Sequence, residues 1–269
     1  MLYTKFRKIV WAQYKKSGRH NLPWRKTTNP YRILVSEVML QQTQVDRVIP
    51  FFNAFIKKFG TPQKLAAAPL SEVLKSWQGL GYNRRAKMLR EAARELAERK
   101  VRTVAEWESL PGVGSYTARA VAAFAYNDDV VFVETNIRTA IIHHFFNENT
   151  TIYGSVSDSQ IEEILRNVLP SGRSREWYGA LMDYGAHLKR SGISYNVRSS
   201  AYLPQKKFAG SGREARGAIV RRLVKGGATL AQLSSLLGDA RKPQIAEALR
   251  ALCAEGLAIK KGNRYVLAG

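Results

Sequence analysis

Cysteine is nearly absent from this sequence of 269 residues, which holds only Cys253. One cysteine excludes an internal disulfide, an all-cysteine zinc site and a cysteine-ligated iron–sulfur cluster. Long apolar runs are also missing, and none approaches the ~20 residues that a membrane-spanning helix requires. The N-terminal residues lack the continuous apolar segment and the small-residue cleavage site of a signal peptide. We therefore expect no membrane association and a reducing compartment, the cytoplasm.

Acidic residues are few. The chain has 21 Asp and Glu against 43 Lys and Arg, which gives a formal net charge of +22 at pH 7. Hydrophobic residues make up 45% of the chain and aromatic residues 10%, enough to bury a sizeable core, so the chain need not be a disordered basic tail. So large a positive charge predicts a polyanionic partner, with nucleic acid ahead of an anionic membrane.

Strand signals are scarce as well, and residues 1–190 predict an all-α domain. The best strand candidate is the short run Val130–Val133. Apolar residues recur at helical spacing in several segments, with proline and glycine between them. The clearest segments are residues 71–77, with Ser71 as the N-cap, and residues 85–100, 117–126 and 178–188.

The composition changes after residue 190. Residues 191–212 are rich in serine, glycine and basic side chains and predict a charged linker or a strap over the first domain. Residues 213–269 then predict three helices and a two-stranded hairpin, which together resemble a winged helix, a small α+β unit. Such a unit could bind DNA or another protein. Its expected elements are helices at 213–224, 230–237 and 244–255 and strands at 257–260 and 264–267.

The segment Leu110–Ala118 is the sharpest local motif, because a turn containing two glycines runs straight into a helix. The backbone N–H groups at the start of such a helix lack partners, and a glycine has no Cβ to keep a phosphate away. We therefore predict that this turn binds a phosphate, although the motif taken alone is also consistent with a simple helix–helix hairpin. The residues assigned to it are Gly112, Val113, Gly114, Tyr116 and Thr117.

Six ordered blocks of sequence carry a resemblance to a known family. The blocks are Leu22–Arg25, Pro30–Tyr31, Ser36–Val45, Trp77–Tyr82, Leu110–Ala118 and Met182–Gly185. In addition, the acidic residue Glu134 follows Gly114 by twenty residues. With these features the chain resembles the helix-hairpin-helix (HhH-GPD) DNA glycosylases and, within them, the MutY-type adenine glycosylases. The resemblance covers about residues 5–190 and implies the helix-hairpin-helix glycosylase fold, with an active site between two helical lobes.

The resemblance implies roles for two carboxylates. Cleaving an N-glycosidic bond needs a proton for the departing base and negative charge beside the developing sugar cation. Glu37 lies at the motif position whose carboxyl protonates adenine at N7, and its apolar neighbours predict a pKa raised by desolvation. Glu134 stands at the place of the family's catalytic Asp and is one methylene longer. Asn136, two residues on, would orient the sugar or the carboxylates.

Tyr116 lies where lyase-active members of the superfamily carry a lysine. A lysine amine can form a Schiff base with the sugar, whereas a phenol cannot. The resemblance therefore implies hydrolysis that releases the base, without strong AP-lyase activity.

The family flips the target base into a pocket and fills the gap that the base leaves. By resemblance, Gln41 and Gln42 form the wedge. Tyr82 would stack near the site, and Asn83 follows it where MutY-type enzymes usually have a second tyrosine. The remaining candidates are Leu22, Trp24, Arg25 and Gly179 for the base pocket and Arg84 and Arg85 for phosphate contacts.

Three features of the MutY pattern are absent. No cysteines follow Met182–Gly185, so we expect no iron–sulfur cluster. His187 is a lone histidine and predicts no metal site, and neither does the adjacent pair His143 and His144, because neighbours on a helix point roughly 100° apart. Gly179 stands where MutY-type enzymes contact adenine with a Gln or Glu, and the winged-helix-like unit replaces the domain that reads 8-oxoguanine. We expect no cofactor.

The sequence thus predicts a monofunctional DNA glycosylase of base excision repair, a monomer associated with the nucleoid in the cytoplasm. Its partner would be double-stranded DNA with a mispaired or damaged base. The leading substrate is adenine opposite guanine or 8-oxoguanine, because Glu37 suits a purine N7. Excision of thymine or uracil opposite guanine is the alternative, for which Gly179, Asn83 and Glu134 leave room. A catalytically silent DNA-binding protein is a third reading, although both 37 and 134 are acidic.

Overall fold

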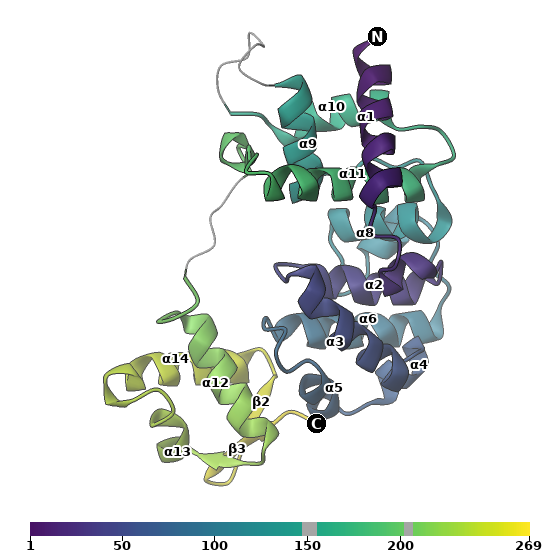
Figure 1. The fold of residues 1–269 in the computed structure, drawn as a ribbon. Helices are drawn as coiled ribbons and strands as arrows, with labels where there is room; N and C mark the ends of the chain where they lie inside the picture. The colour runs from purple at the N-terminus through teal and green to yellow at the C-terminus, as the bar shows by residue number, and fades with distance from the viewer. Residues whose placement is uncertain (147–154, 202–206) are drawn as a thin grey trace. The chain divides into compact units, whose positions relative to one another are not determined.

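The computed structural model describes residues 1–146, 155–201 and 207–269, which are mostly helical with one small sheet (Figure 1). The chain forms two compact units. The first comprises Met1–Glu37, Arg102–Ser109 and Val113–Pro204, and the second comprises Val38–Val101, Leu110–Gly112 and Gln205–Gly269. The C-terminal residues thus share a unit with residues 38–101, a grouping that differs from the expected domains 1–190 and 213–269. No helix in the described ranges is long and apolar enough to span a bilayer.

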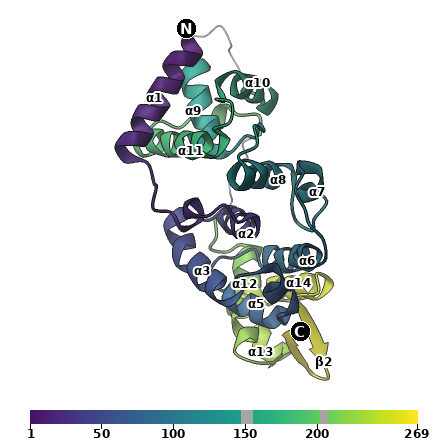
Figure 2. The same cartoon turned by 90° about the vertical axis from the view of Figure 1, so that its right-hand side faces the viewer.

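The first unit is built from helices. Its elements are α1 (Leu2–Ser17), η1 (Pro23–Lys26), most of α2 (Pro30–Leu40), α7 (Val104–Glu108), α8 (Ser115–Val121), η2 (Ala122–Tyr126), α9 (Thr135–Phe145), α10 (Asp158–Val168), α11 (Ser174–Arg190) and η3 (Asn196–Arg198). Helix α11 packs against α9 and α1, and both views show the three helices together (Figures 1 and 2). Their apolar faces form a core in which Phe6, Trp177 and Tyr178 are buried.

Helices α9 and α11 approach each other closely at Gly185. A Cβ atom on this residue would collide with the backbone carbonyl of Asn136, in the first turn of α9. Glycine therefore allows a helix contact that no other residue type would. Because Glu134 is the N-cap of α9, this contact also sets the place of two predicted site residues.

The helical part of the second unit contains the last residues of α2 and four further helices. These are α3 (Val45–Lys58), α4 (Pro62–Ala67), α5 (Leu70–Ser76) and α6 (Arg84–Glu98). Val73, Leu74 and Trp77 are fully buried, as their helical spacing predicts. The prediction that Ser71 is the N-cap is wrong. The Pro69 carbonyl accepts a helical hydrogen bond from the Val73 amide, so α5 begins at Leu70.

The C-terminal part of the second unit has the predicted order of helices and hairpin. Its elements are α12 (Gly212–Val224), β1 (Ala228–Thr229), α13 (Leu230–Ser234), η4 (Asp239–Arg241), α14 (Lys242–Ala254), β2 (Ala258–Lys261) and β3 (Arg264–Leu267). The strands form an antiparallel sheet in the order β1-β3-β2, with Lys261 paired to Arg264 across the turn. Strand β1 was not predicted, because two residues carry no periodicity.

The first unit is helical, as predicted, and one of its helix boundaries differs from the prediction. Val130–Val133 forms no strand. The ring of Phe132 instead stacks on Tyr178 at a centroid distance of 4.0 Å, and the Val130 carbonyl accepts a hydrogen bond from the Tyr178 hydroxyl, so this run packs against α11. The helix expected at 117–126 begins earlier, at Ser115, and continues as the π-helical turn η2.

Candidate active site

Glu37 is a buried carboxyl group near the end of α2, with 6% of its surface exposed. Its neighbours Val38 and Met39 are buried as well. The hydroxyl of Tyr116, in the first turn of α8, donates a hydrogen bond of 2.8 Å to Oε2 of Glu37. Burial raises the pKa of Glu37 to about 7. The hydrogen bond from Tyr116 lowers this pKa, whereas the charge of Glu134 raises it further. The predicted effect of desolvation is confirmed, and Glu37 holds a proton over part of the neutral range.

Tyr116 is held as a neutral phenol. Burial in the first place, and then the Glu37 carboxylate, raise the pKa of Tyr116 well above its ordinary value. Its ring packs edge-on against Phe132, with the ring centroids 5.6 Å apart. A fixed and protonated hydroxyl can donate a hydrogen bond to Glu37 but offers no amine for a Schiff base.

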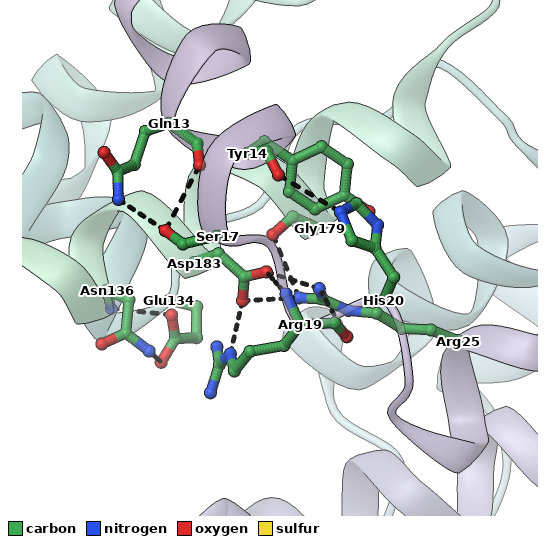
Figure 3. Close-up of polar contacts among 10 residues, drawn as sticks. All are labelled: Gln13, Tyr14, Ser17, Arg19, His20, Arg25, Glu134, Asn136, Gly179 and Asp183. Atoms are coloured by element: carbon green, nitrogen blue, oxygen red, sulfur yellow. Dashed lines mark hydrogen bonds and ion pairs between the residues drawn. The ribbon is translucent and has the colours of Figure 1, made fainter.

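Glu134 is a second, partly buried carboxylate, and it caps its own helix. Its Oε2 accepts a hydrogen bond of 2.7 Å from the backbone N–H of Asn136, and its Oε1 accepts one of 3.1 Å from the Asn136 side chain (Figure 3). Burial raises the pKa of Glu134, whereas the Asn136 backbone hydrogen bond and the charge of Lys189 lower it. Asn136 thus holds the carboxylate of Glu134, and its expected role toward a sugar stays a prediction.

Asp183 on α11 gathers two arginines from the segment that follows α1 (Figure 3). Its Oδ2 lies 2.6 Å from Nη1 of Arg25, and its Oδ1 lies 2.9 Å from Nη2 of Arg25 and 2.5 Å from Nε of Arg19. Oδ2 also accepts a hydrogen bond of 2.7 Å from the Arg19 backbone. Burial alone would raise the pKa of Asp183, but the hydrogen bonds and charges of the two arginines outweigh it and lower the pKa.

Sequence reasoning missed Asp183 as a site residue, although it lies in the motif block Met182–Gly185. The predicted pocket residue Arg25 has most of its hydrogen-bonding capacity engaged here, since its Nη2 also donates to the Gly179 carbonyl at 3.0 Å. Arg25 therefore joins η1 to α11, and Gly179 lies beside it. The predicted pocket residues Leu22 and Trp24 are buried in the same segment.

The second unit holds the predicted wedge and stacking residues. Gln42 and Tyr82 both have left-handed backbones, with φ of 54° and 47°. This conformation costs a residue with a side chain of the order of 1 kcal/mol, and such strain tends to occur at functional sites. Gln42 follows the end of α2 and is exposed, whereas Asn83 is buried at the start of α6.

The prediction that Arg85 contacts phosphate requires correction. Its Nη1 donates to the carbonyls of Val38 and Gln41 at 2.6 and 2.8 Å, and its Nη2 donates to that of Leu80 at 3.2 Å. Backbone oxygens thus occupy the guanidinium, and Arg85 ties the end of α2 to the loop that contains Tyr82. Arg84 is exposed and stays a predicted phosphate contact.

The glycine turn before α8 has the predicted shape. Gly112 has φ of 74°, and a Cβ there would lie 2.5 Å from the Cβ of Met88. Gly114 is the N-cap of α8. The side chains of Val113 and Thr117 are buried, so a phosphate at this turn would meet their backbone N–H groups only.

Within the described ranges, no three His, Cys, Asp or Glu side chains gather closely enough to hold a metal ion. The adjacent histidines have other contacts. Nε2 of His144 lies 2.7 Å from the Tyr184 hydroxyl, and the ring of His143 stacks on Tyr195.

Comparisons with known proteins identify the family of this chain. The family model described as "HhH-GPD superfamily base excision DNA repair protein" matches residues 35–171. A relative named adenine DNA glycosylase, from Mycolicibacterium smegmatis, is 36% identical over 280 residues, which cover 94% of this chain and 92% of the relative. Another of that name, from Mycobacterium tuberculosis, is 45% identical over 135 residues, which cover 48% of this chain and 44% of the relative.

Two solved structures share the fold. The structure of a thermostable thymine-DNA glycosylase is 28% identical with a TM-score of 0.58, over 68% of this chain and 87% of the other. A non-covalent complex of endonuclease III with DNA is 20% identical with a TM-score of 0.55, over 68% of this chain and 85% of the other. The family model matches half of the chain, and the Mycolicibacterium smegmatis relative aligns with 94% of it at 36% identity. The chain therefore belongs to the HhH-GPD superfamily of base excision DNA repair proteins.

Proposed function

We propose that this protein is a monofunctional DNA glycosylase that excises adenine mispaired with guanine or 8-oxoguanine. The observation that carries this proposal is the buried Glu37, whose pKa lies at about 7 and whose carboxyl is fixed by Tyr116. The names of the relatives support the choice of adenine. The net charge of +22 and the DNA in the structural neighbour support double-stranded DNA as the partner, and we propose that the protein binds it as a monomer.

Glu37 would act as the general acid. A departing purine leaves readily only when N7 accepts a proton, and an acid with a pKa near the working pH combines protonation with ready transfer. The neutral carboxyl of Glu37 meets this requirement, and after transfer the Tyr116 hydroxyl stabilises the carboxylate that remains.

Glu134 would stabilise the sugar cation. Loss of the base leaves positive charge on the sugar ring, and a fixed carboxylate in a site shielded from water lowers its energy. Asn136 holds both oxygens of Glu134, so little reorganisation is needed as the charge develops. Water then adds to the cation, and the proton that it loses restores the neutral carboxyl of Glu37, which completes the hydrolysis.

The same chemistry requires neither an iron–sulfur cluster nor another cofactor, and it stops at the abasic site. An AP-lyase step needs an amine that attacks the sugar, and Tyr116 supplies a phenol. We therefore propose release of the base with the DNA strand intact until alkali is added.

A single-turnover assay on duplexes that contain A:8-oxoG, A:G, T:G or U:G tests the proposal. We expect alkali-dependent cleavage at the adenines, and loss of base release in Glu37→Gln with DNA binding retained. The matched control is Glu108→Gln, which changes an exposed glutamate and should keep full activity. Wild-type rates in Glu37→Gln would refute the role of Glu37, and silence on all four duplexes would refute the glycosylase.

Thymine or uracil opposite guanine is the second candidate. The likeness to a thymine-DNA glycosylase favours it, and so does Gly179, which offers no side chain to contact adenine. Cleavage confined to the T:G and U:G duplexes in the same assay would establish this alternative in place of adenine.

A further inference from the structure

Tyr82 lies in the short loop between α5 and α6, just after Gly79 and Gly81. The backbone of Tyr82 is left-handed, and Gly79 and Gly81 before it also have positive φ angles. The side chain is 39% exposed. A ring in such a loop needs side-chain contacts to hold it in one place.

Two guanidinium groups supply those contacts. Cζ of Arg85 lies 5.3 Å and Cζ of Arg213 lies 5.8 Å from the centroid of the Tyr82 ring, both within the range of cation–π attraction. Nη1 of Arg213 also donates a hydrogen bond of 3.0 Å to the Tyr82 hydroxyl. Arg85 belongs to the neighbouring helix, but Arg213 is 131 residues away in sequence, in the first turn of α12.

The backbone that carries Arg213 is itself anchored to the helical part of the second unit. Helix α12 packs against α5. Nζ of Lys87 on α6 donates a hydrogen bond of 2.6 Å to the carbonyl of Glu255, at the end of α14. The Glu255 carboxylate in turn lies 2.5 Å from Nη2 of Arg216 on α12. Arg213 therefore reaches Tyr82 from a helix that is held in place by other contacts.

We propose that Arg213 is a positioning residue that holds the Tyr82 ring for stacking against DNA, so that the C-terminal unit completes the DNA-binding surface of the glycosylase. The inference rests on the proposed glycosylase function. A ring held in advance loses less conformational freedom when it meets a base, and this favours both binding at the lesion and alignment for base release.

A double-mutant cycle on the full-length protein tests this role. We expect Arg213→Ala to lower the single-turnover rate of base release about threefold or more, and to have no further effect in a Tyr82→Ala background. Arg213→Lys keeps the charge but not the planar fork, so it should restore the rate only in part. The control is Arg221→Ala, which removes the same charge from an exposed position on α12.

Affinity for a duplex with a tetrahydrofuran abasic-site analogue provides a second readout that needs no catalysis. Arg213→Ala should weaken this binding more than Arg221→Ala does, and only when Tyr82 is present. Equal losses with and without Tyr82, or equal losses in the two arginine variants, would overturn the role of Arg213. A wild-type protein that binds the analogue with this coupling but releases no base would instead overturn the proposed function.

Discussion

The hydroxyl of Tyr116 donates its hydrogen bond to the carboxyl of Glu37 at a distance of 2.8 Å. This contact opposes burial, because burial disfavours the carboxylate while the hydrogen bond stabilises it. The result is a pKa of about 7, between that of an exposed glutamate and that of a carboxyl buried without a donor. Tyr116 therefore helps to set the pKa of Glu37, and with it the pH range in which Glu37 holds a proton.

Replacement of Tyr116 by Phe should raise the pKa of Glu37, because the carboxylate loses its donor while its burial persists. Base release that depends on the neutral carboxyl falls as pH rises through this pKa. The limb of declining activity, which we expect near pH 7 in the wild type, should thus move to higher pH in Tyr116→Phe. Single-turnover rates measured from pH 5 to pH 9 locate this limb in both proteins.

Tyr3→Phe is the control for this shift, because Tyr3 is exposed on α1. Its profile should coincide with that of the wild type. If the pH–rate profile of Tyr116→Phe loses amplitude but keeps its midpoint, the hydroxyl does not act through the pKa of Glu37.

Glu37→Gln should make the protein more stable at alkaline pH while it removes activity. The pKa of Glu37 is raised from 4.5 in its ordinary state to about 7 in the folded protein. Between these values the folded state keeps a proton that the unfolded state has lost, so wild-type stability falls as pH rises from 4.5 to 7 and then levels off. The amide in Glu37→Gln does not ionise, so the variant does not lose this stability. The loss in the free energy of unfolding of the wild type amounts to at most about 3 kcal/mol.

Urea denaturation at pH 5, 6, 7 and 8 measures the difference. The advantage of Glu37→Gln over the wild type should grow across the series and reach its plateau above pH 7. A constant difference would mean that Glu37 ionises as readily in the folded protein as in the unfolded chain.

Asp183→Asn should destabilise the first unit, because it leaves Arg19 and Arg25 without their shared carboxylate. Removing one partner of a buried ion pair costs about 3 kcal/mol, whereas exposed pairs contribute about 0.5 kcal/mol. The matched control is Asp128→Asn, which breaks the more exposed pair between Arg102 and Asp128. The midpoint of urea denaturation at pH 7 should fall several times further in Asp183→Asn than in Asp128→Asn.

The pH dependence of this effect has a definite sign. The pKa of Asp183 is lowered in the folded protein, so its contribution to stability is present above its ordinary value of 3.8 and is lost as pH falls below it. The difference between the wild type and Asp183→Asn should therefore shrink in strong acid. A difference that stays constant down to pH 2 would contradict the network.

The features that sequence predicts here are local ones. The buried face of α5 and the raised pKa of Glu37 both follow from apolar neighbours within one helix. The order of helices and the hairpin in the C-terminal part follow from periodicity and turn residues. These features depend on the nearest few residues, which the sequence displays directly.

The features that sequence misses depend on partners far along the chain. Arg85 looks like a surface cation, but its partners are backbone carbonyls that any residue type could supply. Asp183 meets Arg25 across 158 residues, and Tyr82 meets Arg213 across 131. No spacing rule connects such pairs, because only the packed fold brings them together.

Two glycines on α11 give opposite predictions for the same substitution. A Cβ on Gly185 would strike the backbone carbonyl of Asn136, which cannot move without displacing the first turn of α9. We expect Gly185→Ala to cost about 3 kcal/mol of stability and to disturb the carboxylate of Glu134 that Asn136 holds. A Cβ on Gly179 would meet Cζ of Arg25 and the Tyr14 hydroxyl at 3.6 Å, an ordinary contact.

Gly179→Ala should therefore leave stability unchanged or raise it by about 0.5 to 1 kcal/mol, because alanine favours the helix. Thermal unfolding of the two variants side by side distinguishes helix propensity from the contact between α9 and α11. If both substitutions shifted the unfolding midpoint equally, the close approach of α9 and α11 at Gly185 would make no contribution of its own to stability. If only Gly185→Ala lowered the unfolding midpoint, and the rate of base release fell in the same variant, the close packing of α9 against α11 would be what keeps Glu134 and Asn136 in place.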